Sequence, residues 1–495
     1  MGISFPVLPE AESPTRFTLL GAWLRWCDKF HYCMNDAAKS ETALPTRLLY
    51  VGDPDPNILR LYCPKENQRL KYVALSHCWG EHPPTKDSPR FCTTDDNIET
   101  RLKRFGFSEL PKTFQDAVRN DWGREAKRME DVFASAYCTI AATSAANSEA
   151  GFLKRSVSTE CVLVQDASGG RFYICADTDD SNNHVDIDDF NDHVEKAPLN
   201  TRAWVMQERI LSRRTIYFSD KQMYWECSKG IYCETLTKLN SSLRKTYFTL
   251  DSNFPDRLLK SGDRRTTEFL RFFSEEYSKR DLTKETDRCF AASGLEARIA
   301  GAMWCQSRYD IFGMYLHRNL LWQRSAGEKT PRIGYEPGLV PSWSWMAYGG
   351  SIRFMEIPFG DVDWAQNLRF IEEEEGKKNH VLLTDVGVFW NCSLEQRDAS
   401  YAVLDSSKVE RGQIWYDIEV SIDPHTERCI VVGRNSPGGE HGSSNKYYIL
   451  VVRRTSVDDE YTRVGVGWVD SDYVFRSPIH YAVSTLHRYC VIKIR

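Results

Sequence analysis

Strand and helix signals alternate along residues 71–229, and this alternation constrains the fold more than any other feature of the chain. The segments KYVALSHCW (71–79) and YCTIAATSA (137–145) are short apolar runs typical of buried strands. TRAWVMQERILS (201–212) is typical of a helix, and TIYFSDKQMYWEC (215–227) contains two apolar runs around a polar turn, which indicates a β-hairpin. Such alternation predicts a parallel or mixed sheet with flanking helices.

Two amphipathic helices are predicted between the first two of these strands. LPKTFQDAV (110–118) and EAKRMEDVFASA (125–136) each carry apolar residues at helical spacing, which is the pattern of a helix with one buried face. Only RNDWGR (119–124) separates the two apolar stripes. The connection is therefore too short to hold a further strand.

The rest of the chain divides by the type of pattern. LLGAWLRWCDKFHYC (19–33) predicts a helix, and two short strand signals follow it. Amphipathic helical stretches dominate after residue 230, around TTEFLRFFSEEYS (266–278) and GMYLHRNLLWQ (313–323), whereas short β-rich runs replace them after PSWSW (341–345). We therefore expect a leading segment, an α/β core, a mainly helical extension and an antiparallel β module, at residues 1–70, 71–229, 230–345 and 346–495, respectively.

Composition narrows the class of partner. The formal charge is −5 and the pI is near 6.2, so a global basic field for nucleic acid or an anionic membrane is absent. The chain has no Walker loop, GxGxxG, GxSxG or HExxH motif, which removes support for the common phosphate-binding and hydrolase mechanisms. We expect no nucleic-acid and no membrane partner.

Cysteine usage and the first residues indicate the compartment. The chain contains 15 cysteines without any CxxC pair, which argues against a disulfide framework and for a reducing environment. The start, MGISFPVLPEAESP, has neither the charged nor the apolar region of a secretion signal. A cytoplasmic protein is expected.

Polar and aromatic side chains follow the first strand where it ends. KYVAL is largely apolar, and Ser76, His77, Cys78 and Trp79 come after it. In open α/β sheets, ligands bind beyond the carboxyl ends of the strands, so Ser76, His77 and Trp79 are candidate substrate-binding residues. The alternative is a strand end with a buried tryptophan and a hydrogen-bonded histidine.

The cysteines near histidines do not predict nucleophilic or metal chemistry. Cys78 and His77 are adjacent in a strand and point to opposite faces, so the imidazole does not naturally reach the thiol. Cys27, His31 and Cys33 offer three ligands for a metal, but a fourth at a recognised spacing is missing. We therefore predict inert core thiols and no metal site.

A carboxylate interrupts the apolar stripe of the helix predicted at 201–212. Trp204, Glu208 and Leu211 share one face because i, i+4 and i+7 positions align on a helix. Burial beside Trp204 would disfavour the charged form of Glu208 and raise its pKa, as in many active sites. The alternative is an ion pair with a nearby arginine, for which the candidates are Arg202, Arg213 and Arg214.

Four segments, in order, resemble the signature blocks of the fungal heterokaryon incompatibility (HET) domain family. They span about residues 71–229 and are KYVALSHCWG, LPKTFQDAV, DWGREAKRMEDVFASAYCTIAATSA and LNTRAWVMQERILSRRTIYFSDKQMYWEC. Flanking segments such as LPTRLLYVG, DRCFAASGLEARIAG and VPSWSWMAYGG are similar to the extensions of long HET-domain proteins.

The resemblance implies a fold, a role and a substrate. HET domains are thought to be remote relatives of TIR domains, which implies a TIR-like, flavodoxin-like, mostly parallel sheet, and a role in nonself recognition and programmed cell death with a protein partner or self-association. Some TIR domains cleave NAD with a helical glutamate that follows a tryptophan, and AWVMQER resembles that arrangement. NAD is then the expected substrate, without a resident cofactor, and Glu208 the expected catalytic residue. Ser76 and His77 would contact ribose or phosphate, and Trp79 or Trp204 would stack on a ring.

The resemblance also predicts a missing strand. In family members a strand with a Trp-Ile-Asp sequence follows the helix corresponding to 110–118, whereas here Asn120 directly precedes Asp121. Either coding sequence has been skipped or this copy has degenerated. Loss of a strand from the middle of the sheet would leave buried backbone groups unpaired, at about 1–3 kcal/mol each. The sheet must then re-pair across the gap or stay open, and we expect a degenerate chain that is less stable than a complete relative and impaired in activity. A non-catalytic interaction module and a Cys/His hydrolase are the alternatives to an NAD-cleaving enzyme.

Overall fold

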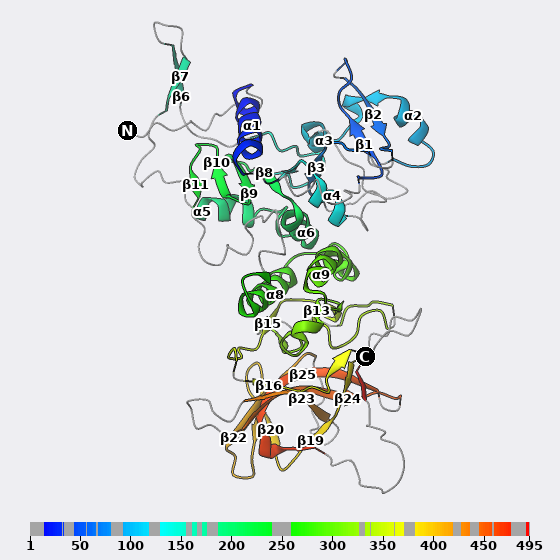
Figure 1. The fold of residues 1–495 in the computed structure, drawn as a ribbon, viewed down its shortest axis with the longest axis vertical. Coiled ribbons are helices and arrows are strands. Elements are labelled where there is room, and N and C mark those ends of the chain that lie inside the picture. Colours follow the sequence, from blue (N-terminus) through cyan, green and yellow to red (C-terminus); the bar gives the residue numbers. More distant parts are fainter. Residues whose placement is uncertain are drawn as a thin grey trace. The chain divides into compact units, whose positions relative to one another are not determined.

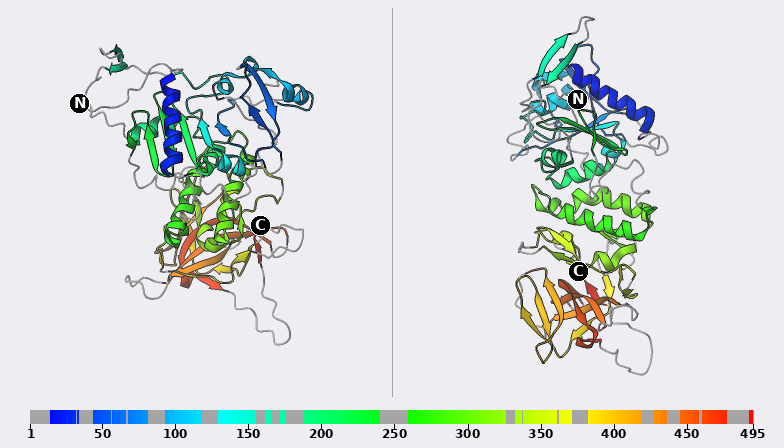
Figure 2. Two further views of the ribbon diagram at one scale, coloured as in Figure 1. Left: turned by 45° about the horizontal axis from the view of Figure 1, so that its top comes forward. Right: turned by 90° about the vertical axis from the view of Figure 1, so that its left-hand side faces the viewer.

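The computed structural model describes residues 14–494 except 32, 34–43, 56, 66–67, 81–92, 118–128, 155–160, 166–170, 176–186, 240–258, 326–331, 337, 361, 371–381, 419–426, 436–444, 458–459 and 477–491. The chain forms two compact units, Met1–Arg257 and Leu258–Arg495, drawn in Figure 1 and Figure 2. The domain limits that we place at residues 70, 229 and 345 stay predictions.

A six-stranded mixed sheet forms the centre of the N-terminal unit. In spatial order its strands are β11 (Lys238–Leu239), β10 (Gly230–Cys233), β9 (Met223–Cys227), β8 (Arg214–Phe218), β5 (Cys138–Ala141) and β3 (Val73–Ser76). β3, β5 and β8 pair in parallel, which confirms the predicted α/β core. β8 to β11 pair antiparallel, because consecutive hairpins return the chain, so the sheet is mixed rather than mostly parallel.

The first two parallel strands are direct neighbours. Val73 of β3 lies opposite Cys138 of β5, and the register continues to Ser76 and Ala141. Of the two expected outcomes, a sheet that pairs across the gap and a sheet that stays open, the structure has the first for these two strands. The junction of Asn120 and Asp121 lies outside the described residues, so the missing segment itself stays a prediction.

Helices connect the strands where the periodicity predicts them. The predicted helices are present as α1 (Pro14–Trp26) with the π-helical turn η1 (Cys27–His31), α3 (Lys112–Ala117), α4 (Met129–Ser135) and α6 (Ala203–Leu211), and α5 (Ile187–Phe190) with η5 (Asn191–Glu195) precedes α6. In α6 nearly every side is buried, which differs from the predicted single stripe. The reason is that the sheet, α4 and η5 all pack against it.

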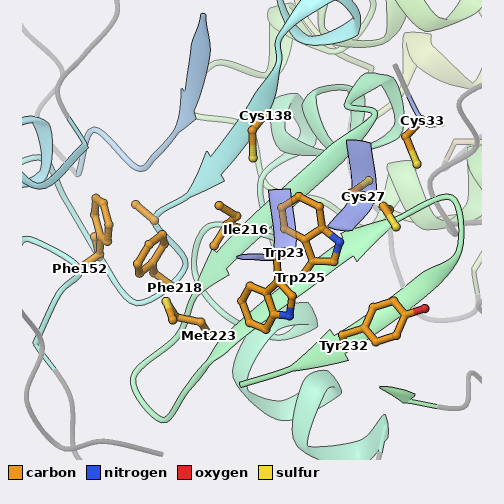
Figure 3. Packing of buried hydrophobic residues seen from close by; sticks show 13 residues of the cluster. Trp23, Cys27, Cys33, Cys138, Phe152, Ile216, Phe218, Met223, Trp225 and Tyr232 are labelled. Atoms are coloured by element: carbon orange, nitrogen blue, oxygen red, sulfur yellow. The ribbon is translucent and has the colours of Figure 1, made fainter. Parts of the chain in front are cut away.

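The two faces of the mixed sheet carry separate cores, since successive strand residues point to opposite sides. On one face Ile216 and Trp225 pack under Trp23 of α1, as Figure 3 shows. On the other face Tyr217 and Tyr224 pack against Val205 of α6. Residues that alternate along one strand therefore belong to different sites.

A small three-stranded sheet precedes the central one in the chain. Its strands are β1 (Leu48–Tyr50), β2 (Ile58–Tyr62) and β4 (Phe105–Gly106), followed by η3 (Phe107–Glu109), with α2 (Ile98–Lys103) before β4; a separate hairpin is formed by β6 (Cys161–Gln165) and β7 (Arg171–Cys175). The two predicted early strands are confirmed as β1 and β2. Leu59 and Phe105 of this sheet pack with Phe114 and Trp79 near the end of β3.

The C-terminal unit begins with two helices. α8 (Asp263–Ser278) confirms the amphipathic stretch in this region, since its buried residues include Phe269, Phe273 and Tyr277. α9 (Phe290–Met303) follows it. The helix expected around residues 313–323 is largely wrong, because only short turns form there before a strand. The remaining short elements are η7 (Glu285–Asp287), β12 (Ser307–Arg308), β13 (Ile311–Phe312), η8 (Gly313–Tyr315), α10 (Leu316–Asn319), β14 (Trp322–Arg324), η9 (Trp345–Ala347) and β15 (Ile352–Phe354).

A twelve-stranded sheet completes the C-terminal unit and confirms the predicted antiparallel β module. Its strands are β16 (Val362–Trp364), β17 (Arg369–Phe370), β18 (Leu382–Thr384), β19 (Gly387–Phe389), β20 (Ser393–Gln396), β21 (Tyr401–Leu404), β22 (Glu410–Tyr416), β23 (Glu427–Asn435), β24 (Lys446–Arg454), β25 (Glu460–Asp470), β26 (Val474–Arg476) and β27 (Ile492–Ile494), with η10 (Ser471–Tyr473) before β26. All its pairs are antiparallel except β25 with β27. Among the helices of the described residues, none is long and apolar enough to cross a bilayer.

Candidate functional site

The candidate site lies where the carboxyl end of β3 meets α6. β3 ends at Ser76, and α6 begins after Arg202, whose backbone is extended. Ser76 and Glu208 are both buried, and the serine hydroxyl influences the ionisation of the glutamate. The structure therefore brings together two of the predicted site residues that are far apart in the sequence.

Glu208 has the electrostatic properties of a functional carboxyl group. Its exposed fraction is only 6%, and burial raises the pKa of the carboxyl to about 7, while Ser76 and then the charge of Arg202 act in the opposite direction. Among the described residues, neither Glu208 Oε2 nor Ser76 Oγ has a hydrogen-bond partner. An unpaired buried carboxyl oxygen is costly for folding, and such a cost is typical of a group kept for binding or catalysis.

The nearby arginines make other contacts, so the ion-pair alternative is not what the structure contains. Arg214 forms an ion pair with Asp28 at 2.8 Å, and Arg213 donates to the backbone carbonyl of Ala134 at 3.0 Å. Arg202 Nη1 donates to the carbonyl oxygen of His77 at 3.0 Å. Within the described part of the chain, Glu208 has no ion-pair partner within 4.0 Å.

Two neighbours of Glu208 were not among the predicted site residues. Arg202 links the end of β3 to the start of α6. Its positive charge opposes the rise in pKa that burial causes at both Glu208 and Cys78. Burial, opposed by Arg202, raises the pKa of the Cys78 thiol, and Glu208 adds to the rise. Cys78 is therefore a protonated thiol beside the carboxyl, which agrees with the predicted inert thiol. The sequence could have predicted that Cys78 lies near Glu208, because side chains two residues apart in extended chain share a face and Ser76 is on that face.

His77 and Trp79 belong to the opposite face of β3. The His77 ring packs against the rings of Trp79 and Phe114, with centroid separations of 4.8 Å and 4.6 Å. Burial, with the charge of Arg202, lowers the pKa of His77 to about 3, so the ring is neutral at pH 7, and its Nε2 has no hydrogen-bond partner among the described residues. The geometry thus splits the predicted set: Ser76 faces Glu208, and His77 and Trp79 form an aromatic cluster on the other side.

Trp204 lies one helical turn before Glu208 and is partly buried. The i, i+4 relation puts its side chain on the same face of α6 as Glu208. Trp204 keeps its place as the candidate ring-stacking residue.

A buried ion-pair network fixes α6 against the sheet. Arg209 contacts Glu195 of η5 at 2.8 Å and Glu226 of β9 at 3.2 Å, and the Tyr217 hydroxyl donates to Glu226 at 2.6 Å. The sequence alone did not identify this network, because its members come from separate elements. Its physical effect is to hold the helix that carries Glu208, since each charge is paired where water is excluded.

Comparison with protein families identifies the domain. The family model described as Heterokaryon incompatibility protein (HET) matches residues 119–208. This part of the chain, 90 of its 495 residues, therefore matches a heterokaryon incompatibility domain. The matched segment includes α4, β5, α5 and α6 as far as Glu208. Comparison with curated proteins and with solved structures finds no match.

The HET domain match supports a heterokaryon incompatibility role in general. It covers the helix that carries the candidate carboxyl group and ends at that residue, while β3, which contributes Ser76, lies before the matched segment. The Glu208 site is thus shared between the matched segment and the strand that precedes it.

Proposed function

We propose that the α/β core of this HET domain hydrolyses NAD as part of a fungal nonself response that ends in cell death. Its fold would be TIR-like, with three parallel strands and a glutamate on α6, the helix that directly precedes β8 in the chain. The protein would act in the cytoplasm, with a protein partner or a second copy as its trigger. This proposal rests on the resemblance of AWVMQER to the catalytic helix of NAD-cleaving TIR domains and on the surroundings of Glu208.

The proposed reaction breaks the bond between the ribose C1′ atom and the nicotinamide nitrogen. Nicotinamide leaves with the bonding electron pair, which neutralises its ring, and positive charge develops on the ribose. Ionised Glu208 would stabilise that charge across a short distance in a site from which water is largely excluded. A water molecule then adds to C1′ and releases a proton, which gives ADP-ribose and nicotinamide.

The neighbours of Glu208 support separate parts of this role. Ser76 is buried beside Glu208 and offers a hydroxyl for contact with a ribose oxygen. Arg202 lies close enough to lower the pKa of Glu208 and so favours the carboxylate form that the reaction needs. Trp204 offers a ring for stacking on nicotinamide or adenine. The single observation that carries the proposal is the buried carboxyl of Glu208, which lacks an ion-pair partner in the described part of the chain.

Nicotinamide release by the purified full-length chain tests this proposal. We expect turnover of NAD by the wild-type chain and a loss of at least about a hundredfold in Glu208→Gln, because the amide keeps the shape and removes the charge. The matched control is Glu296→Gln in α9. Burial also raises the pKa of Glu296 to about 7, but this residue lies in the C-terminal unit, and its substitution should leave the rate within about twofold.

Two outcomes would reject the proposal. Turnover that survives Glu208→Gln would show that another residue carries the reaction. If the wild-type chain and both variants are folded and none of them releases nicotinamide, the result would support a non-catalytic interaction module instead.

A further inference from the structure

Three cysteines and one histidine from distant parts of the chain meet on the face of the sheet opposite Glu208. Cys27 and His31 come from η1, Cys33 follows that turn, and Cys227 ends β9. Their four ligand atoms all lie within 4.8 Å of one another, and His31 Nδ1 is 3.3 Å from Cys227 Sγ. Figure 3 shows Cys27 near the rings of Trp23 and Trp225, and Cys33 on the far side of Cys27 from these rings.

The dimensions of this cluster fit a tetrahedral zinc ion. Zinc takes thiolate ligands at about 2.3 Å and imidazole nitrogen at about 2.0–2.1 Å, which places ligand atoms about 3.5–3.8 Å from each other in a tetrahedron. Because the ligand atoms lie within 4.8 Å of one another, no pair must approach by more than about 1.3 Å, which is within reach of side-chain rotation. Three sulfurs and one imidazole nitrogen form a recognised structural zinc set.

The surroundings are those of a buried structural site. Cys27, Cys33 and Cys227 are at most 1% exposed, and all three are free thiols. His31 is partly buried, and a neutral imidazole nitrogen is a common zinc ligand.

Charges next to the cluster complement a zinc–thiolate centre. Zinc with three thiolates and a neutral imidazole has a net charge of −1. The positive charges of Lys229 and Lys238 act on His31, and that of Arg214 acts on Cys27. The Ser228 hydroxyl lies 3.1 Å from Cys33 Sγ, where it can donate to a thiolate and orient it, as outer-shell groups do in metal sites.

We propose that Cys27, His31, Cys33 and Cys227 bind one structural Zn²⁺, which attaches the N-terminal helix to strand β9. Four protein ligands leave no open position for substrate, so the role is structural rather than catalytic. The ion would connect η1 to β9 across a long stretch of sequence and hold Trp23 against Trp225, whose ring centroids are 6.1 Å apart. Strand β9 also carries Glu226, which contacts Arg209 of the α6 network.

Metal content of the full-length protein tests the site. The wild-type chain, purified under reducing conditions from zinc-supplemented cells, should contain one zinc per chain by elemental analysis. Cys227→Ser should lose that zinc. The matched control, Cys138→Ser, removes another buried thiol of the same sheet that is not one of the four ligands, and it should keep one zinc per chain.

Zinc-edge X-ray absorption of the wild-type chain covers the case in which Cys227→Ser does not fold. We expect three sulfur neighbours and one nitrogen neighbour. A wild-type chain without zinc, equal zinc in the wild type and a folded Cys227→Ser, or a first shell of oxygen and nitrogen atoms alone would each overturn the proposal. A disulfide between any two of the three cysteines in the reduced, zinc-supplemented protein would also overturn it.

Discussion

The raised pKa of Glu208 makes the free energy of unfolding depend on pH. Burial raises the pKa of its carboxyl to about 7, whereas an unfolded chain has the ordinary value of about 4.3. Between these pH values the folded state binds a proton that the unfolded state has lost, so the free energy of unfolding falls as the pH rises through this window. Below the window both states are protonated and the effect disappears.

Glu208→Gln removes this pH dependence because an amide does not titrate. We expect the variant to gain stability relative to the wild type as the pH rises from 5 to 8, by up to roughly 3 kcal/mol. Urea unfolding at a series of pH values measures the difference. A difference that stays constant over this range would contradict the raised pKa.

Local sequence patterns predict some residues of the candidate site and miss others. Glu208 stood out because a carboxylate occupied an apolar helical stripe, and its burial is now explained by packing on several sides of α6. The separation of Ser76 from His77 follows from the alternation of side chains along a strand. The contact of Arg202 with the His77 carbonyl had no local signal, because it depends on where α6 packs relative to β3.

At the scale of elements, close packing of strands makes particular glycines indispensable. Gly467 of β25 faces β22, and an added Cβ atom would clash with the backbone carbonyl of Gln413 and lie 3.0 Å from the Cα atom of Ile414. A backbone neighbour within a sheet cannot rotate away as a side chain can. The requirement follows from the pairing of Ile414 with Gly467.

Gly467→Ala should therefore destabilise the C-terminal unit by about 1–3 kcal/mol or more, as overpacked cores are. Gly301→Ala in α9 is the control, because its added Cβ meets nothing within 4 Å, and alanine favours a helix over glycine by about 0.5–1 kcal/mol. Thermal unfolding of both variants measures the effects. A neutral Gly467→Ala would refute the close approach of β22 and β25.

Elements with a strong local period were predicted well. α8 follows the spacing of its buried aromatic residues, and β8 with β9 follows two apolar runs around a polar turn. The helix predicted at 313–323 is largely wrong. Its apolar residues have helical spacing, but Trp322 pairs with Phe354 in a two-stranded sheet. A tertiary partner decided that element, not its intrinsic propensity.

At the scale of the whole molecule, each unit has its own hydrophobic core. Two clusters cover the faces of the mixed sheet in the N-terminal unit, and a third fills the antiparallel sheet of the C-terminal unit. A unit with its own core has the main requirement for folding by itself.

Calorimetry of the full-length chain should therefore resolve two unfolding transitions. A fragment of residues 1–257 should unfold cooperatively at the midpoint of one of them, and Gly467→Ala should move only the other. One transition that shifts as a whole in Gly467→Ala would show that the two units unfold together.

The sequence by itself determined the elements with a clear period, the α/β class of the core and the β-rich C-terminal module, because these depend on patterns within short stretches of the chain. Only the tertiary structure decided which side chains meet. His31 and Cys227 are 196 residues apart in the chain. Only folding brings Cys227, at the end of β9, beside the three candidate ligands that are close together in the sequence. Ser76 reaches Glu208 in the same way, since strand pairing and helix packing, rather than spacing, bring them together.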